Sequence, residues 1–224
     1  MKSIQAFNYL LGKLFNNNKT YINHSLFYLK RRRNIDRHYM DYIRISTLEL
    51  VAEEIKEKNL QGAVAELGVY KGKFARYINL YFPERKLYLF DTFKGFAESD
   101  IKSEIDKNYS AGDQDFSNTS AKKVLSIMPH PQNCVIREGF FPSTAEGLEE
   151  EFVFVSIDTD LYDPIYNGLV YFYPRLQKGG YIFVHDYNND HYAGTRRAVR
   201  QYCEENNLSY VPIPDSIGSC VIAK

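Results

Sequence analysis

The chain has 224 residues, of which 44% are hydrophobic and 25% are charged, and this composition fits one globular α/β domain. Twenty-eight basic side chains balance 28 acidic ones, so the overall charge gives no reason to expect nucleic acid as a partner. Three cysteines without C-x-x-C spacing exclude a disulfide framework and a structural zinc site and favour a cytoplasmic protein, and no apolar run approaches the roughly 20 residues of a transmembrane helix.

Residues 1–40 predict a basic, helical N-terminal extension. They hold eight Lys or Arg residues against one acid, a net charge of +7, and Ile4, Phe7 and Leu11 recur near helical spacing. Two interpretations remain open for this extension. It is either an amphipathic segment that contacts a membrane, a partner or phosphate groups, or a helical cap with a solvated basic turn, which we favour.

From residue 41 onwards the pattern alternates between helices and strands. The expected elements are, in order, helix 41–58, strand 63–68, helix 72–82, strand 86–91, helix 121–127, strand 133–138, a short helix from residue 143, strand 151–158, helix 163–176, strand 181–186, helix 191–206 and two closing strands at 208–213 and 219–223. This alternation predicts a parallel sheet with right-handed crossovers. Residues 94–118 are polar and rich in acids, and we expect a lid there rather than a disordered connection.

The most informative stretch is residues 62–72, a short apolar strand followed by a turn with two glycines. Gly68 and Gly72 let the backbone come close to a ligand at the point where a strand leads into a helix. Open α/β sheets bind nucleotide-like ligands at such a turn. Asp91 ends the next strand, where an acid typically bonds ribose hydroxyls.

Four predicted strands end in an acid, and a fifth is followed by Gly139; the acids are Glu66, Asp91, Asp158 and Asp186. Because the carboxyl ends of parallel strands share one edge, we expect these acids to share one pocket. Carboxylates that converge need hydroxyls, an amine or a cation to satisfy them, and Asp158 with Asp186 suits Mg²⁺ or Ca²⁺. The alternative is that each acid caps the helix that follows it.

Five segments, residues 66–72, 90–93, 139–142, 157–162 and 173–187, resemble the macrocin O-methyltransferase family in sequence and in order. The resemblance covers roughly residues 42 to 224. It implies an enzyme that transfers a methyl group from S-adenosylmethionine to a sugar hydroxyl. It also implies a Rossmann-like, seven-stranded class I methyltransferase sheet whose last strand is antiparallel, formed by residues 41–224.

The resemblance also implies roles for individual residues. The cofactor would be held by Glu66, Gly68, Val69, Tyr70, Asp91, Thr92, Phe93, Ser120, Gly139, Phe140 and Asp158, with Glu66 at the methionine part, Asp91 at the ribose and Thr92 and Phe93 beside the adenine. Mg²⁺ would be held by Asp158 and Asp186. His185 departs from the family pattern, which has an aspartate there, so the ion could be bound weakly, bound with help from Asn188, or lost.

Methyl transfer requires the acceptor hydroxyl to lose its proton. We expect Asp158, helped by a cation, to take part in this step, and His185 as general base is the alternative. The expected partners are a small sugar or glycoside substrate and further copies of the same chain.

Three other functions were weighed. A catechol-type O-methyltransferase acting on an aromatic diol is disfavoured because Leu161 stands where that type usually has a lysine. A non-catalytic nucleoside-binding protein remains open. An NAD-dependent reductase is the weakest rival, because the first glycine turn lacks the Gly-x-Gly-x-x-Gly pattern.

Overall fold

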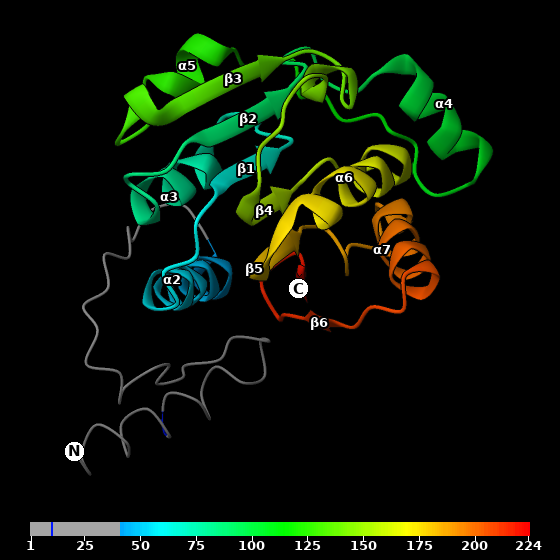
Figure 1. The fold of residues 1–224 in the computed structure, drawn as a ribbon. Helices are drawn as coiled ribbons and strands as arrows, with labels where there is room; N and C mark the ends of the chain where they lie inside the picture. The colour runs from blue at the N-terminus through cyan, green and yellow to red at the C-terminus, as the bar shows by residue number, and fades with distance from the viewer. Residues whose placement is uncertain (1–9, 11–40) are drawn as a thin grey trace. The chain divides into compact units, whose positions relative to one another are not determined.

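The computed structural model describes residues 41–224 together with Leu10, so the basic extension predicted for residues 1–40 lies outside the described residues apart from that single position. Within residues 41–224, seven strands form one sheet in the order β3-β2-β1-β4-β5-β7-β6 (Figure 1). The strands are β1 (Ala63–Leu67), β2 (Leu87–Asp91), β3 (Cys134–Glu138), β4 (Phe152–Ile157), β5 (Leu176–Val184), β6 (Tyr210–Pro212) and β7 (Cys220–Ala223). The pairs from β3 to β5 are parallel, and β7 is antiparallel to both β5 and β6. The predicted sheet with an antiparallel last strand is confirmed.

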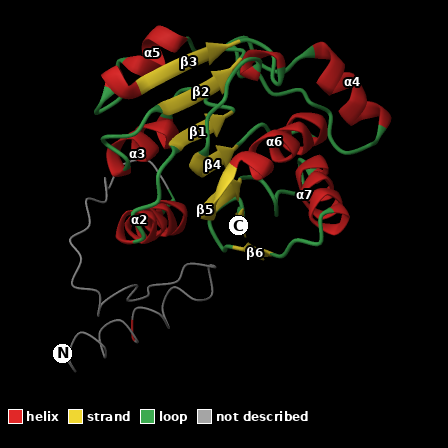
Figure 2. Ribbon diagram, in the orientation of Figure 1, coloured by secondary structure: helices red, strands yellow, loops and turns green. Residues whose placement is uncertain are grey.

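Helices cover both faces of this sheet, as Figures 1 and 2 show. The helices are α2 (Tyr42–Glu57), α3 (Lys73–Tyr81), α4 (Glu98–Asp106), α5 (Ala121–Leu125), α6 (Tyr162–Arg175) and α7 (Ala193–Glu205), with short 3₁₀ turns at Pro131–Asn133 and Ser143–Ala145. Buried residues of α2, α3 and α5 belong to one apolar cluster, and those of α6 and α7 belong to the other. In the described part of the chain, no helix combines the length and apolar character needed to cross a membrane.

Strand β1 shows how the two clusters are divided. Ala65 and Leu67 pack with α6 and α7, whereas Val64 packs on the opposite face with α2 and α3, because successive side chains of a strand point to opposite faces. Glu66 continues on the face of Val64 and is 1% exposed. Glu66 therefore occupies a buried position of β1 at which an apolar residue is expected.

The strand register brings the expected site residues to one edge. Leu67 pairs with both Phe90 and Ile157, and Ile157 pairs in turn with Val184. The residues that follow these strand ends therefore lie side by side. Because β4 and β5 are parallel neighbours, the prediction that Asp158 and Asp186 follow adjacent strands is confirmed.

Two elements differ from the sequence prediction. Helix α4 lies within residues 94–118. The sequence shows no apolar pattern of helical spacing there, because the one buried residue of α4 is an acid, Glu104. Strand β5 begins at Leu176 rather than at residue 181. Gly180 suggested a turn, but a Cβ there would lie 2.8 Å from the carbonyl oxygen of Val153, so this glycine serves the close approach of two strands.

Candidate active site

The turn from β1 into α3 brings two backbone segments into contact. Gly68 has a φ of 84°, and a Cβ atom built on it would lie 2.0 Å from the carbonyl oxygen of Asp158. The backbone amide of Asp158 donates to the carbonyl of Leu67 at 2.8 Å, so the ends of β1 and β4 are held together. A residue with a side chain could adopt neither this φ nor this distance without displacing β4.

Asp91 fixes the first residues after this glycine. Its Oδ2 accepts hydrogen bonds from the backbone amides of Val69 and Tyr70, both at 2.7 Å, and its Oδ1 accepts one from Phe93 at 2.6 Å. A carboxylate has about four acceptor positions, so three amides leave capacity for a hydroxyl of a ligand. Asp91 thus shapes the turn and still faces the cavity described below.

Glu66 is the least satisfied group of the site. Burial, followed by the charge of Asp158, raises the pKa of its carboxyl well above the ordinary value. Its Oε2 has no hydrogen-bond partner among the described residues. Because a buried polar atom without a partner is energetically unfavourable, this oxygen indicates a ligand that carries a hydrogen-bond donor, such as an amine.

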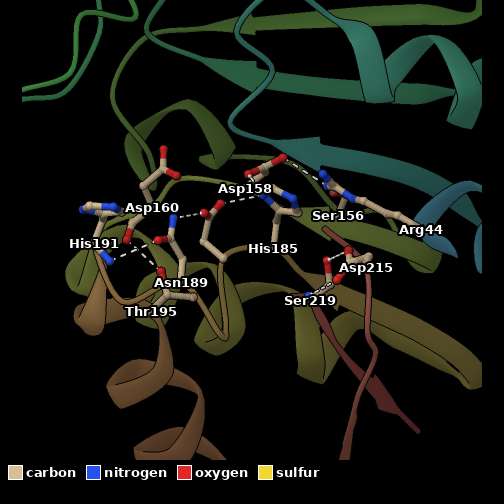
Figure 3. A network of polar contacts seen from close by, with 11 residues as sticks. Arg44, Ser156, Asp158, Asp160, His185, Asn189, His191, Thr195, Asp215 and Ser219 are labelled. Carbon is tan, nitrogen blue, oxygen red and sulfur yellow. Dashed lines mark hydrogen bonds and ion pairs between the residues drawn. The ribbon is translucent and has the colours of Figure 1, made fainter. Parts of the chain in front are cut away.

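A charged network follows the ends of β4 and β5 (Figure 3). Asp158 lies between two cationic groups: Arg44 Nη2 donates to its Oδ2 at 3.0 Å, and His185 Nδ1 lies 3.0 Å from its Oδ1. The same Nδ1 lies 2.5 Å from Asp186 Oδ2, and Asn189 Nδ2 donates to Asp186 Oδ1 at 2.6 Å. Because ionised carboxylates can only accept, the proton of these short contacts lies on Nδ1.

Electrostatics follow from this geometry. Burial alone would raise the pKa of Asp158, but the charges of His185 and Arg44 hold it below its ordinary range. Burial would likewise lower the pKa of His185, but the carboxylate of Asp158 overrides it and raises the pKa to about 10. At neutral pH the pair is therefore an imidazolium and a carboxylate, and each stabilises the charge of the other.

Asp160 differs from Asp158, although only one residue separates them. Burial, and then the charges of Asp186 and Asp158, raise the pKa of its carboxyl well above the ordinary value. Its backbone has a φ of 60°, a left-handed conformation that is uncommon outside glycine, and Thr195 Oγ1 donates to its carbonyl oxygen at 2.7 Å. Asp160 is thus a carboxyl that is held in an unusual conformation and is readily protonated.

All of these groups face one cavity of about 530 Å³, a volume in the usual range for a small-molecule site. Besides the strand ends, it is lined by the start of α2, by part of residues 94–118 and by Ser216 and Ile217 of the C-terminal loop. The cavity combines apolar walls with converging polar groups, which is typical of cofactor sites.

Helix α4 is fastened beside this cavity by its one buried residue. Glu104 is 1% exposed, and its Oε2 accepts a hydrogen bond from the backbone amide of Tyr162 at the start of α6, at 3.0 Å. A Cβ atom on Gly194 at the start of α7 would lie 2.4 Å from Glu104 Oε1. Lys107 adds an ion pair to Asp163 of α6 at 2.9 Å. Glu104 of α4 therefore caps the N-terminus of α6.

The structure brings most of the predicted site residues together. The cavity is lined by Glu66, Gly68, Val69, Tyr70, Asp91, Thr92, Gly139, Phe140, Asp158, His185 and Asp186. Two predicted cofactor residues, Phe93 and Ser120, are not part of the lining. Phe93 is 7% exposed within the α2–α3 cluster, and Ser120 caps α5 by accepting from the amide of Lys123 at 3.3 Å.

Three polar residues around Asp158 and Asp186 were not predicted as site residues: Arg44, Asp160 and Asn189. Asp160 could have been found, because it repeats the acid of Asp158 two positions later in the same loop. Nothing in the local sequence around Arg44 indicated its role, since its partner lies 114 residues further along the chain. Asn189 follows Asp186 by three residues, within a turn where Asn is common for reasons of backbone geometry alone.

The residues present fit the expected methyl donor. S-adenosylmethionine carries an amine, two ribose hydroxyls and a positive sulfonium, and the cavity presents the unpartnered oxygen of Glu66 and the remaining acceptor capacity of Asp91. Several carboxyl groups around the cavity would be satisfied by such a cationic ligand.

The expected Mg²⁺ is a different case. Asp158, His185 and Asp186 offer donor atoms within 4.8 Å of one another, which is close enough for one ion. However, all four oxygens of the two carboxylates already contact Arg44, His185 or Asn189. Mg²⁺ prefers oxygen donors, whereas this set includes an imidazole whose Nδ1 contacts both carboxylates, and the guanidinium of Arg44 lies against Asp158. As arranged, these residues do not fit Mg²⁺.

Comparisons with known proteins identify the family and the fold of this chain. The family model described as macrocin-O-methyltransferase (TylF) matches residues 32–217. The O-methyltransferase NovP has a TM-score of 0.62 and 19% identity, with 81% of this chain and 79% of that chain covered. CalS11, a calicheamicin methyltransferase, has a TM-score of 0.64 and 18% identity, with 80% of this chain and 78% of that chain covered. Cofactor-bound Rv0187 from MTB has a TM-score of 0.55 and 15% identity, with 85% of this chain and 83% of that chain covered. These three likenesses show a shared fold, and no curated protein matches the sequence.

Proposed function

This chain belongs to the macrocin O-methyltransferase family and is an S-adenosylmethionine-dependent O-methyltransferase of sugar hydroxyls, and we propose that its acceptor is a nucleotide-activated sugar or a sugar within a larger glycoside or glycan. The observation that carries this proposal is the convergence of strand-end acids on one cavity. Glu66, Asp91, Asp158 and Asp186 all line it.

Within this cavity we assign the cofactor to the β1 and β2 side. Glu66 would bond the amine of the methionine part, and Asp91 would bond ribose hydroxyls while it holds the amides of Val69 and Tyr70. The sulfonium would then face the ends of β4 and β5, where the carboxyl groups lie. This arrangement is supported by the register of the sheet, which places those strand ends beside β1.

Methyl transfer is an in-line displacement. The acceptor oxygen forms a bond to the methyl carbon while the carbon–sulfur bond breaks, and its electron pair stays on sulfur. The proton of the hydroxyl must pass to a base near the methyl group. Asp158 and His185, the two predicted candidates, face the cavity, but each is engaged with the other as an ion pair. We therefore assign them to the positioning of the acceptor and to charge stabilisation.

The base that best fits the geometry is Asp160. Asp160 lines the cavity, and burial and the charges of Asp186 and Asp158 raise the pKa of its carboxyl, whereas the pKa of Asp158 is held below its ordinary range. A bound sulfonium would lower this pKa by its positive charge, so the cofactor itself would prepare the carboxylate that accepts the proton. The proton would then leave to solvent when the products dissociate.

The acceptor class is supported by charge at the cavity mouth. Lys71 and Lys73 are exposed, and both line the cavity. Ammonium groups suit the phosphates of a nucleotide-bound sugar. A solved neighbour, CalS11, is described as a TDP-rhamnose 3′-O-methyltransferase, which is an acceptor of this class.

Residues 94–118 are proposed to act as the lid. Phe96, Asp100 and Phe116 of this stretch line the cavity, and Glu104 fastens α4 to the start of α6. Closing such a segment would exclude water from the sulfonium.

Two further predictions from the sequence concern the cell and assembly. A cytoplasmic enzyme is supported by Cys134, Cys203 and Cys220, which are all free thiols. The homo-oligomer stays a prediction, whereas the predicted Mg²⁺ does not fit the residues present and is considered in the next subsection.

The test is mass spectrometry of acceptors incubated with the protein and S-adenosylmethionine. We expect a nucleotide-activated sugar to gain one methyl group and the free sugar to react less. Cofactor binding without methyl gain on any sugar acceptor would instead support the non-catalytic nucleoside-binding alternative.

A further inference from the structure

The network around Asp158 has a consequence for the chemistry of the site. Arg44 and His185 contact the two oxygens of Asp158 (Figure 3). His185 and Asn189 contact the two oxygens of Asp186. Each of the four carboxylate oxygens therefore already has a nitrogen partner within 3.0 Å, and a cation would have to displace at least one of these partners.

Arg44 is built into this position. It is 3% exposed, its Nη2 also donates to Ser156 Oγ at 3.3 Å, and its guanidinium lies 3.8 Å from the centre of the Phe74 ring. Guanidinium keeps its positive charge throughout the range of pH in which proteins fold. A divalent ion bound to Asp158 would therefore lie close to a buried positive charge that cannot move into solvent.

His185 closes the other side of the site. As a metal ligand its Nδ1 would have to release the proton that now lies between Asp158 Oδ1 and Asp186 Oδ2, at 3.0 and 2.5 Å. Both carboxylates would lose this partner at the same time. To bind Asp158, His185 and Asp186, an ion would therefore have to break the contacts that these three residues make with one another.

We propose that this site works without a divalent cation, and that Arg44 and His185 together take the place such an ion would fill. Arg44 is a positioning residue, because it lines the cavity and acts on the reaction by orienting Asp158. The proposal rests on the proposed function, since it concerns how that methyl transfer is carried out.

The experiment measures metal binding directly. Chelator-treated full-length protein is titrated with MnCl₂ and with MgCl₂ by calorimetry, and Mn²⁺ is followed in parallel by electron paramagnetic resonance. We expect no saturable binding at millimolar ion, and S-adenosylmethionine affinity and turnover that EDTA changes by less than about twofold. Stoichiometric Mn²⁺ binding by the wild-type protein, or turnover lost in EDTA and restored by metal, would overturn the proposal.

Two double variants test whether Arg44 and His185 are what prevents a divalent ion from binding. In R44M/H185D a third carboxylate is added and the guanidinium is removed, so we expect Mn²⁺ binding to appear. In R44K/H185D the same carboxylate is added but a cation is kept, and we expect at least about tenfold weaker binding than in R44M/H185D. Equal binding by the two variants, or binding by neither, would overturn the assignment to Arg44 and His185. The single variant R197M, on the exposed side of α7, should behave as the wild type.

The result also separates this inference from the proposed function. Wild-type protein that binds S-adenosylmethionine and methylates a sugar only when metal is present refutes the inference alone. Protein that binds no S-adenosylmethionine with or without metal refutes the proposed function, and the titration still reports whether the ion binds.

Discussion

Arg44 Nη2 donates a hydrogen bond to Asp158 Oδ2 at 3.0 Å, and the two residues are 114 positions apart in the sequence. This contact ties the first described helix, α2, to the loop after β4. Together with the larger effect of the charge of His185, it holds the pKa of Asp158 below its ordinary range, so this carboxylate is poorly suited to accept a proton. The neighbouring Asp160, whose carboxyl has a raised pKa, is left as the group able to exchange a proton.

The first prediction concerns the proposed base. Asp160→Asn keeps the size of the side chain but cannot accept the acceptor's proton, so we expect kcat to fall by about 10²- to 10⁴-fold. Affinity for S-adenosylhomocysteine, which lacks the sulfonium charge, should change little in calorimetry because Asp160 is not assigned a contact with the cofactor. His185→Gln is the matched comparison. A smaller loss in Asp160→Asn than in His185→Gln would move the base to His185.

The second prediction concerns Gly68. In Gly68→Ala the new Cβ would overlap the carbonyl oxygen of Asp158 at 2.0 Å, so β4 must shift, and we expect the free energy of unfolding in urea to fall by more than about 3 kcal/mol. Gly147→Ala is the control, because Gly147 has a φ of 69° but no atom within 4 Å of the added Cβ. It should lose only about 1–2 kcal/mol. Equal losses would show that close approach does not matter at Gly68.

How far the sequence determined the site can be seen from these residues. Glu66, Asp91 and Asp158 were predictable, because apolar runs locate strands and the ends of parallel strands share an edge. Arg44 was not predictable, since its role depends on a contact between distant segments. The family resemblance placed Ser120 near the cofactor. In the structure its side chain caps α5, which its position before that helix already permitted, and its role at the cofactor stays a prediction.

Residues 94–118 were predicted as a distinct segment, but the helix within them was not predicted. Polarity and length distinguished residues 94–118 from their surroundings, but polarity also concealed α4, which has Glu104 as its buried residue. A helix that docks through an acid has no apolar stripe for a pattern to detect.

The third prediction tests that docking. Glu104→Ala leaves the amide of Tyr162 without its acceptor, so we expect α4 to loosen by about 1–3 kcal/mol. Amide hydrogen exchange over residues 94–118 should accelerate, and the KM for the acceptor should rise more than the Kd for the cofactor. Lys102→Ala, exposed on the same helix, is the control. Unchanged exchange in Glu104→Ala would mean that other contacts hold α4.

The fourth prediction is a pH dependence of stability. The pKa of His185 is raised from 6.5 to about 10, so its charged form stabilises the folded state. That contribution is complete below pH 6.5, the pKa of the unfolded chain, and is lost as the pH rises through about 10. The difference in unfolding free energy between wild type and His185→Gln should therefore shrink from pH 6.5 to pH 10. A constant difference over this range would contradict the ion pair.

The most direct measurement is a crystal structure of the protein with S-adenosylhomocysteine, the demethylated cofactor. The account predicts electron density for the adenosine in the 530 Å³ cavity, its ribose at Asp91, its amine at Glu66 and its sulfur directed towards Asp158 and Asp160. Density at another surface, or a cavity closed by side chains in the presence of saturating ligand, would contradict it.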